Sequence, residues 1–154
     1  MTTTLKSVVV LDTSVIMKWF RAGETLAAEA TALRQAYYED QLNVVAPDLI
    51  PYELANALRY SSSVSQADSV SAMESLYALG IEIMPATSAR IARALDLAYQ
   101  HDITVYDAAF VALAEELEAD FVTADEKLMR KVQPLPFCHF LADVAPPPVA
   151  PEEE

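Results

Sequence analysis

The amino-acid sequence predicts an α/β fold, specifically a three-layer α/β/α sandwich on a short, mostly parallel sheet. Short apolar runs alternate with longer helical segments along the chain, and strands joined by helices form right-handed crossovers between parallel strands. The length of 154 residues corresponds to a single domain, which at this size buries enough surface to fold without a disulfide or structural metal. Hydrophobic residues make up 53% of the chain and charged residues 21%, which is typical of a globular protein.

Five short runs are predicted to be strands, because each is largely apolar and is bounded by residues that favour turns or helix starts. In chain order they span residues 6–11, 42–46, 81–84 and 120–123, followed by residues 136–141 as an edge strand. Their number and spacing predict a small sheet.

Seven helices are predicted between and after these strands. They span residues 15–20, 24–39, 48–60, 65–79, 87–101, 106–118 and 125–130. Gly80 is expected to end the fourth of them, because glycine readily adopts the left-handed conformation that follows many helices. Residues 1–144 are expected to form one domain, and residues 145–154 (APPPVAPEEE) a disordered tail rich in proline and glutamate.

Composition excludes several classes of function. Two glycines are too few for a Walker A loop or a G-x-G-x-x-G fingerprint. The net charge of −13 disfavours binding nucleic acid through bulk electrostatics, although a metal ion can reverse the field at a local site. The single cysteine, Cys138, rules out an internal disulfide and fits a reducing compartment. With no signal peptide and no apolar run of membrane-spanning length, we expect a soluble cytoplasmic protein.

Two aspartates follow predicted strands. Asp12 comes directly after residues 6–11, and Asp125 follows residues 120–123 with one residue between. Because ligands bind at the carboxyl ends of strands in open parallel sheets, the two carboxylates could converge on one site. The alternative is that each caps the helix after it, since aspartate is among the best N-cap residues.

Glu53 lies on the apolar face of its predicted helix, which it shares with Ile50 and Leu54. A carboxylate on an inward face needs a partner, because burying an unpaired charge is costly. The alternative is that its long side chain reaches solvent or an arginine such as Arg59.

Asp107 similarly extends the apolar stripe of its predicted helix, which continues at Phe110, by one turn toward the amino end. Here the alternative is specific. Thr104 and Asp107 have the spacing of a capping box with aspartate in place of glutamate, and an acid in the first turn also suits the helix dipole.

Together the four acids supply what a hard divalent cation requires, since Mg²⁺ and Mn²⁺ prefer carboxylate and water oxygens. The four are Asp12, Glu53, Asp107 and Asp125. By contrast, His101, His139 and Cys138 lack the spacing of zinc ligands. We interpret the histidines as ordinary surface or strand-end residues and the cysteine as a small buried hydrophobe.

The segments around the four acids read, in chain order, VLDTSV and KWF (residues 10–15 and 18–20), YELANAL (52–58), YDAAFVALA (106–114) and FVTADEKL (121–128). They resemble the successive motifs of PIN-domain nucleases, especially VapC-type toxins of toxin–antitoxin pairs. The resemblance covers about residues 6–142 and implies a PIN-like fold. One departure is Glu118, where the family often has a glycine at the end of the third-motif helix, which puts that C-cap in doubt.

By the same resemblance, the chain is expected to be a Mg²⁺- or Mn²⁺-dependent endoribonuclease. The four acids would surround the metal, and Ser14 and Thr123 would be supporting hydroxyls. A small antitoxin partner and a homodimer are also implied. Because four carboxylates form a negative well, we expect the partner to insert a basic residue. Lys127, Arg130 and Lys131 are candidate contacts for substrate phosphates; alternatively they complement the end of their helix.

Two other functions are considered. A non-catalytic PIN-like interaction module would share the fold, and a metal-dependent RNA cleavage assay would distinguish it from a nuclease. A receiver-like phosphoacceptor domain is disfavoured, because no acidic cluster precedes Asp12. Trp19 and Phe20 are interpreted as core or interface anchors, with stacking on an RNA base as the alternative.

Overall fold

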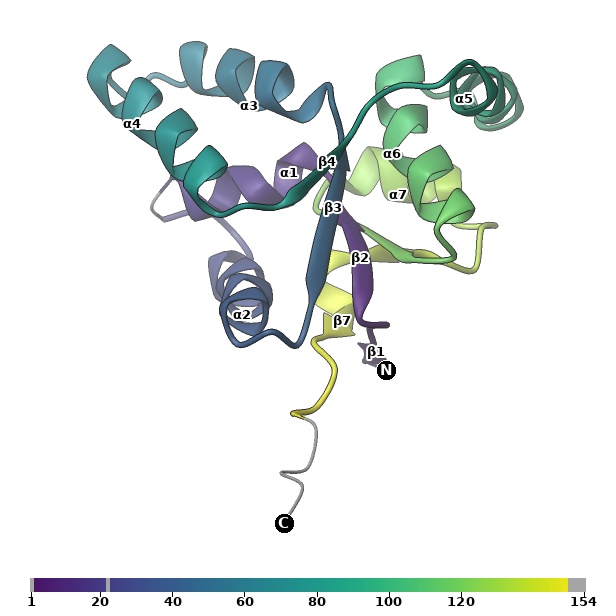
Figure 1. Ribbon diagram of the computed structural model, residues 1–154, viewed down its shortest axis with the longest axis horizontal. Coiled ribbons are helices and arrows are strands. Elements are labelled where there is room, and N and C mark those ends of the chain that lie inside the picture. Colours follow the sequence, from purple (N-terminus) through teal and green to yellow (C-terminus); the bar gives the residue numbers. More distant parts are fainter. Residues whose placement is uncertain (1, 22, 150–154) are drawn as a thin grey trace.

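The computed structural model describes residues 2–21 and 23–149. Its main sheet has five strands in the order β4-β3-β2-β5-β6, and every neighbouring pair is parallel. The strands are β2 (Val8–Leu11), β3 (Asn43–Pro47), β4 (Glu82–Met84), β5 (Asp120–Thr123) and β6 (Cys138–Phe140). The predicted parallel sheet and its edge strand are confirmed (Figure 1).

The order of the strands reverses between β2 and β5. After β2 the chain adds β3 and β4 on one side, then returns to place β5 against the other side of β2. In the register, Leu11 of β2 lies opposite Val122 of β5. A switch point of this kind opens a crevice at the carboxyl ends of the two strands, where open α/β sheets bind ligands. Asp12 follows one of these strand ends and Asp125 the other.

Helices cover both faces of the sheet, which confirms the three layers. Figure 1 shows α1, α2, α3 and α4 on one side and α5, α6 and α7 on the other. The α-helices in the described residues are α1 (Thr13–Ile16), α2 (Ala27–Tyr38), α3 (Ile50–Arg59), α4 (Gln66–Ala78), α5 (Ser88–His101), α6 (Val105–Glu116) and α7 (Glu126–Val132). Two short 3₁₀ helices are η1 (Met17–Trp19) and η2 (Leu141–Asp143).

Helix α6 is the most deeply buried helix and positions one of the candidate acids. Residues 108–114 are all buried, and the helix packs on β2, β3 and β5. Burying side chains such as Phe110 and Leu113 stabilises the fold by roughly 1.5–3 kcal/mol each. Because α6 leads into β5 and runs back against the strand direction, its amino end, with Asp107 in the first turn, lies at the carboxyl edge of the sheet.

The chain between β2 and α2 differs from the sequence prediction. The helix expected over residues 15–20 is the short α1 followed by η1. The next helix begins at Ala27 rather than residue 24, because Leu26 adopts a left-handed conformation with φ of 62°. Trp19 is only 8% exposed and donates from Nε1 to the Ala30 carbonyl oxygen at 2.8 Å. Its interpretation as a core anchor is therefore confirmed.

A second, two-stranded sheet was not predicted. In it β1 (Thr3–Thr4) pairs in parallel with β7 (Val144–Ala145), and the backbone N–H of Leu5 donates to the Ala145 carbonyl oxygen at 2.9 Å. Ala145 thus belongs to the folded body, although the disordered tail was expected to begin there. Two-residue strands carry too little hydrophobic pattern to be predicted. Residues 146–149 have no regular secondary structure, and the rest of the predicted tail, residues 150–154, lies outside the described residues.

Helices α4 and α6 are each followed by a residue of positive φ, a glycine in one case and a glutamate in the other. Gly80 follows α4 with φ of +69°, as the helix stop required. Glu118 follows α6 and also has a positive φ, 53°, where a residue with a Cβ is strained. Lys6 Nζ donates to the Glu118 carbonyl oxygen at 3.1 Å.

In the part of the chain that the structure describes, no helix is long and apolar enough to cross a bilayer.

Candidate functional site

The four predicted acids come from four separate elements that meet at the carboxyl edge of the sheet. Asp12 precedes α1, Glu53 lies in the first turn of α3, Asp107 in the first turn of α6, and Asp125 precedes α7. Electrostatic repulsion links them, because each of the first three has a pKa that is raised in part by at least one of the others. We call these four side chains the acidic site.

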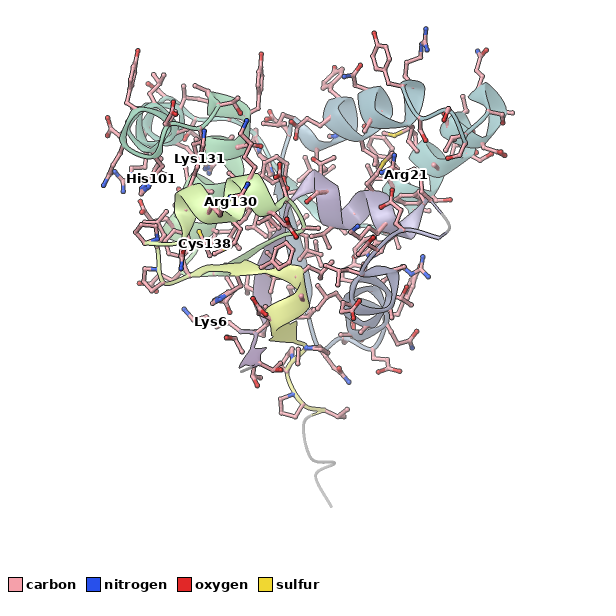
Figure 2. All side chains as sticks on the ribbon, turned by 180° about the vertical axis from the view of Figure 1, so that it is seen from behind. Lys6, Arg21, His101, Arg130, Lys131 and Cys138 are labelled. Carbon is pink, nitrogen blue, oxygen red and sulfur yellow. The ribbon has the colours of Figure 1, made fainter. Side chains whose placement is uncertain are left out.

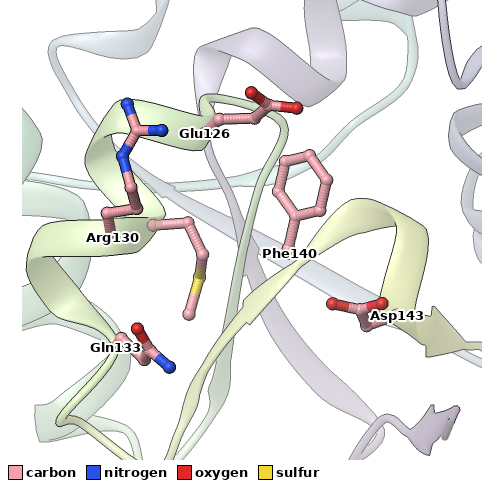
Figure 3. A pocket seen from close by; sticks show the side chains of 6 residues that line it. Glu126, Arg130, Gln133, Phe140 and Asp143 are labelled. Carbon is pink, nitrogen blue, oxygen red and sulfur yellow. The ribbon is translucent and has the colours of Figure 1, made fainter.

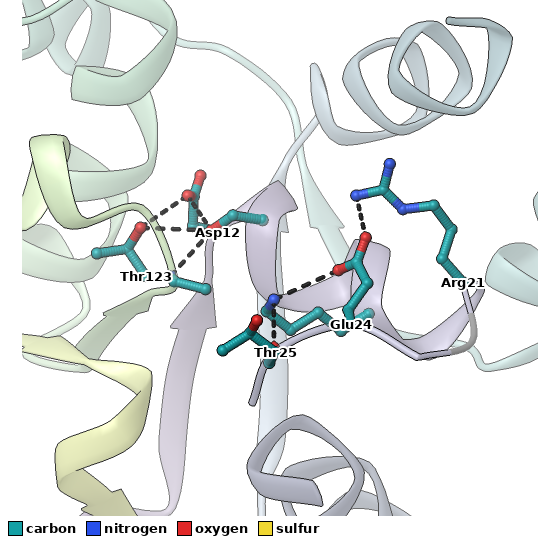
Figure 4. A network of polar contacts seen from close by, with 8 residues as sticks. Asp12, Arg21, Glu24, Thr25 and Thr123 are labelled. Atoms are coloured by element: carbon teal, nitrogen blue, oxygen red, sulfur yellow. Dashed lines mark hydrogen bonds and ion pairs between the residues drawn. The ribbon is translucent and has the colours of Figure 1, made fainter. Parts of the chain in front are cut away.

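Asp12 is the most buried member of the acidic site, with 6% of its surface exposed. Two hydroxyls donate to its Oδ2 atom, Ser14 Oγ at 2.7 Å and Thr123 Oγ1 at 2.9 Å. Figure 4 shows the Thr123 contact across the switch point. The Ser14 Oγ atom in turn accepts the backbone N–H of Ala124 at 2.9 Å. Both hydroxyls predicted to support the site therefore contact an acid of the site directly.

The pKa of Asp12 is raised above its ordinary value chiefly because burial disfavours the charged carboxylate. The hydrogen bonds from Ser14 and Thr123 act in the opposite direction, and the nearby charge of Asp125 raises the pKa further. Asp12 occupies the N-cap position of α1 but makes no side-chain capping bond. The capping alternative therefore does not explain why an aspartate stands here.

Glu53 is held by a partner that the sequence did not indicate. Thr13 Oγ1 donates to Glu53 Oε1 at 2.8 Å, which ties the first turn of α3 to the start of α1. The suggested partner Arg59 instead stacks over the Tyr60 ring, 5.2 Å from its centroid. Burial raises the pKa of Glu53, the Thr13 hydroxyl lowers it, and the charges of Asp12 and Asp107 raise it further. Glu53 thus faces the other acids rather than a cation.

Asp107 also has a raised pKa. Its pKa is raised from 3.8 to about 6, first by burial and then by the charges of Asp12 and Asp125, while Thr104 and Lys131 lower it. The capping geometry is also present, since the backbone N–H of Asp107 donates to Thr104 Oγ1 at 3.1 Å. The Thr104 hydroxyl also lowers the pKa of the Asp107 carboxyl, so this capping contact and the nearby acids both act on Asp107.

Asp125 caps the amino end of α7, which confirms the capping alternative for this residue. Its Oδ1 atom accepts the backbone N–H groups of Lys127 at 2.9 Å and Leu128 at 3.2 Å. Its own N–H donates to Thr123 Oγ1 at 3.1 Å, so Thr123 connects Asp12 and Asp125. The cap fixes the side chain beside the switch point, and a carboxylate has a second oxygen for another contact. Capping and a place in the acidic site are therefore compatible.

Two of the three candidate phosphate contacts lie beside the acids. Lys127 and Lys131 line a cavity of about 240 Å³ together with Asp107 and Asp125. Lys131 Nζ also donates to the carbonyl oxygen of Asp102, the C-cap residue of α5, at 2.7 Å. Figure 2 shows Lys131 on the same side of the molecule as His101, the last residue of α5. Both lysines lie on one face of α7, because residues four apart on a helix are neighbours.

Arg130 is not brought to the acidic site. It lines a different pocket with Glu126, on the other face of α7 (Figure 3). The physical reason is helix geometry: residues 126 and 130 share one face and residues 127 and 131 another. The run of three cations in the sequence thus divides between two surfaces.

Other cations near the switch point are already paired. Lys18 Nζ lies 3.3 Å from Glu24 Oε2 and donates to the Thr25 carbonyl oxygen at 2.7 Å. Arg21 also pairs with Glu24, as Figure 4 shows beside the Asp12 contacts. Because Glu24 neutralises part of this charge, the acidic site keeps its excess of negative charge.

His139 and the cysteine take structural positions, whereas the Nε2 atom of His101 is buried without a hydrogen-bond partner among the described residues. His139 of β6 contacts Asp120 Oδ1 through Nε2 at 2.9 Å, and the other oxygen of Asp120 accepts the backbone N–H of Lys6 at 2.8 Å. Burial raises the pKa of the Cys138 thiol to about 12, so the thiol stays protonated. Asp120 is a buried acid that sequence reasoning did not single out, and its contacts lie at the opposite edge of the sheet from the acidic site.

The acidic site fits a hard divalent cation by its chemistry. Within residues 2–21 and 23–149, no three His, Cys, Asp or Glu side chains form a ready-made metal site. Mg²⁺, however, usually binds proteins through one or two carboxylates and keeps several waters. The pKa values of Asp12, Glu53 and Asp107 are raised first by burial and then by the charges of neighbouring acids, and a cation would relieve that repulsion. The residues present therefore fit Mg²⁺ or Mn²⁺ held partly through water.

Comparisons with known proteins agree with this fold. The sequence model of the PIN domain family matches residues 9–133. Ribonuclease VapC3 of Pyrobaculum aerophilum is 32% identical over 126 residues, which cover 79% of this chain and 92% of that protein. Among solved structures, a toxin–antitoxin complex from Klebsiella pneumoniae superposes with a TM-score of 0.64 at 15% identity, covering 86% of this chain and 97% of that one.

A second solved structure is VapBC2 from Rickettsia felis bound to a DNA fragment from the promoter. It superposes with a TM-score of 0.62 at 12% identity, covering 86% of this chain and 96% of that one. Identities this low support the fold alone, whereas the family match spans most of the chain and includes all four acids. The chain belongs to the PIN domain family.

Proposed function

We propose that this protein is a metal-dependent endoribonuclease that cleaves RNA phosphodiester bonds as the toxin of a toxin–antitoxin pair. The observation that carries the proposal is the acidic site: four carboxylates from four elements at the switch point, three of them with a pKa raised by burial and further by the charges of the others. Strongly perturbed acids grouped at a ligand-binding edge are typical of functional sites. The similarity to Ribonuclease VapC3 and to a solved toxin–antitoxin complex supports the same reading.

Asp12 and Asp107 would be the principal ligands of Mg²⁺ or Mn²⁺. Glu53 and Asp125 would bind a second ion or orient metal-bound water. When bound, the ion would lower the pKa of a water molecule and polarise the phosphoryl oxygens of the RNA. His139 contacts Asp120, and among the described residues no histidine lines the cavity that Asp107 and Asp125 share.

The other residues of the site would prepare these acids for that role. Ser14 and Thr123 orient Asp12 by donating to one of its oxygens, and Thr13 orients Glu53. Hydroxyl donors also favour the charged form of a carboxylate, which is the form that binds a cation. Lys127 and Lys131 would hold substrate phosphates at the rim, because they line the same cavity as Asp107 and Asp125.

The partner is proposed to be a small antitoxin that inserts a basic residue into the acidic site. A guanidinium or ammonium group there would form charge-assisted hydrogen bonds with the carboxylates and compete with the metal. We further propose that the protein works in the cytoplasm as a homodimer. The exposed side chains of Tyr52, Tyr99 and Tyr106 provide aromatic surface of the kind enriched at protein interfaces.

The experiment is cleavage of a generic single-stranded RNA in Mg²⁺ or Mn²⁺ by the wild type, Asp12→Asn and Asp68→Asn. Asp68 is an exposed acid in the first turn of α4 and serves as the matched control. We expect Asp12→Asn to lose cleavage by orders of magnitude and Asp68→Asn to match the wild type. If wild type and Asp12→Asn are equally inactive in every metal, the non-catalytic interaction module replaces the nuclease; equal activity of all three proteins removes the acidic site from catalysis.

A further inference from the structure

A second pocket lies on the face of α7 that points away from the acidic site. It has a volume of about 400 Å³, within the roughly 300–1,000 Å³ that is usual for ligand pockets. We call it the outer pocket, and Figure 3 shows it from close by. Its lining residues are Glu126, Met129, Arg130, Gln133, Phe140 and Asp143.

The outer pocket opens at the same edge of the sheet as the acidic site. Phe140 ends β6, and its register partner on β5 is Thr123, which donates to Asp12. Neighbouring strands lie about 4.8 Å apart, so the pocket is one strand farther out than the end of β5. Glu126 follows Asp125 directly in the chain. An RNA strand that passes the acidic site would therefore reach the outer pocket within a few nucleotides.

The lining of the outer pocket combines an apolar surface with polar groups that have no partner. Met129 packs against the core as a partly buried hydrophobic, and Phe140 at the end of β6 is half-buried. In the described ranges, the guanidinium of Arg130 makes no ion pair and no hydrogen bond, although Glu126 lies four residues before it on the same helix face. The side chains of Glu126, Gln133 and Asp143 likewise have none there. Four of the six lining residues are therefore polar, exposed and available to hydrogen-bond a ligand that rests on Met129 and Phe140.

The polar groups select among planar ligands. An arginine pairs with the O6 and N7 acceptors of guanine, and a carboxylate accepts hydrogen bonds from a base that presents N–H donors. Figure 3 shows Arg130 and Asp143 on opposite sides of the Phe140 ring, with Glu126 nearby. Guanine has both an acceptor pair and N–H donors, whereas adenine lacks the O6 acceptor that arginine would bind. The aromatic ring of Phe140 offers a face or edge for the base.

We propose that the outer pocket binds a guanine base of the RNA substrate next to the cleavage position, and so contributes to the choice of cleavage sequence. This inference rests on the proposed function. It also answers a difficulty of that function: a chain of net charge −13 gains little affinity for RNA from bulk electrostatics, so base contacts must carry more of the recognition.

The first test does not depend on cleavage. The protein in EDTA is titrated with guanosine 5′-monophosphate or adenosine 5′-monophosphate, and backbone amide shifts are followed by NMR. We expect shifts clustered at Met129, Arg130 and Phe140, with at least fivefold tighter binding of the guanosine nucleotide. Arg130→Gln should remove that difference, while Arg59→Gln, an exposed arginine on α3, should keep it. Equal affinity for the two nucleotides, or a preference that survives Arg130→Gln, would overturn the proposal.

The second test uses cleavage of a randomised RNA pool in Mg²⁺, with the cut ends sequenced. We expect guanine to be enriched at least fivefold at one position near the cut, and this enrichment to fall toward one among the cuts that Arg130→Gln still makes. Cleavage with no guanine enrichment in the wild type would overturn the pocket proposal and leave the nuclease intact. A wild type that cuts no RNA overturns the proposed function instead, and the nucleotide titration alone then decides the pocket.

Discussion

Replacing Asp107 with asparagine should stabilise the metal-free protein at neutral pH. Asparagine has nearly the same shape, and the backbone N–H of residue 107 keeps its bond to Thr104 Oγ1. The substitution removes one of the charges that repel one another in the acidic site. If Asp107 served only the helix dipole of α6, the same change would instead destabilise the protein by about 0.3–1 kcal/mol. The two roles therefore predict opposite signs.

The magnitude follows from the pKa of Asp107, which is raised from 3.8 to about 6. A pKa unit corresponds to about 1.4 kcal/mol, and solvent screening of this half-buried group reduces the total to the order of 1 kcal/mol. Because the folded state holds the proton more tightly, the associated stability is fully present below about pH 4 and is lost as the pH rises to about 6. Asp107→Asn should thus gain nothing at pH 4 and about 1 kcal/mol at pH 7, or roughly 2–4 °C in Tm.

The assay is thermal unfolding in EDTA between pH 4 and pH 8 for the wild type, Asp107→Asn and the control Asp68→Asn. The wild type should lose stability as the pH rises from 4 to 6, with a shallower loss in Asp107→Asn because Asp12 and Glu53 still titrate in the same direction. A lower Tm for Asp107→Asn at pH 7, or a shift of equal size at pH 4 and pH 7, would refute the electrostatic reasoning.

Three further changes test other contacts. Thr123→Val should destabilise the protein by about 1–3 kcal/mol in urea unfolding, because it removes a fully buried hydroxyl that contacts Asp12 and Asp125. The control Thr31→Val, at an exposed position, should leave stability unchanged. Equal effects of the two substitutions would show that these hydrogen bonds of Thr123 do not stabilise the fold. Ending the chain after Ala145 should change Tm by less than about 2 °C, whereas ending it after Asp143 removes β7 and should lower Tm by several degrees; identical values would show that β7 contributes nothing. Glu118→Gly should raise stability by about 0.5–1 kcal/mol in thermal unfolding, since glycine relieves the left-handed strain, and a loss would mean that the Glu118 side chain matters more than its backbone.

Much of the fold could be predicted because its signals are local. Apolar runs marked the five strands of the main sheet, and Gly80 marked a helix end. The order of the strands could not be read in this way, because it depends on which runs pair across the sheet. The pairing of β1 with β7 joins residues about 140 positions apart through strands too short to carry a pattern.

The same distinction explains the candidate site. Asp12 and Asp125 were predictable from strand ends, and Glu53 and Asp107 from helix stripes. The contact between Thr13 and Glu53 was missed because it spans 40 residues and the hydroxyl looked like an ordinary helix start. Arg130 was grouped with Lys127 and Lys131 by sequence proximity, but helix periodicity separates them in space.

Metal removal and restoration in the wild type tests directly whether the four carboxylates act through a divalent cation. Cleavage of a generic RNA is measured in Mg²⁺, after addition of excess EDTA, and after Mg²⁺ or Mn²⁺ is restored. If the four carboxylates act by holding a divalent cation, cleavage should stop in EDTA and recover with added metal, and Asp107→Asn should remain inactive under all three conditions. Cleavage that continues unchanged in EDTA, or an Asp107→Asn protein that cuts RNA as fast as the wild type, would contradict the account.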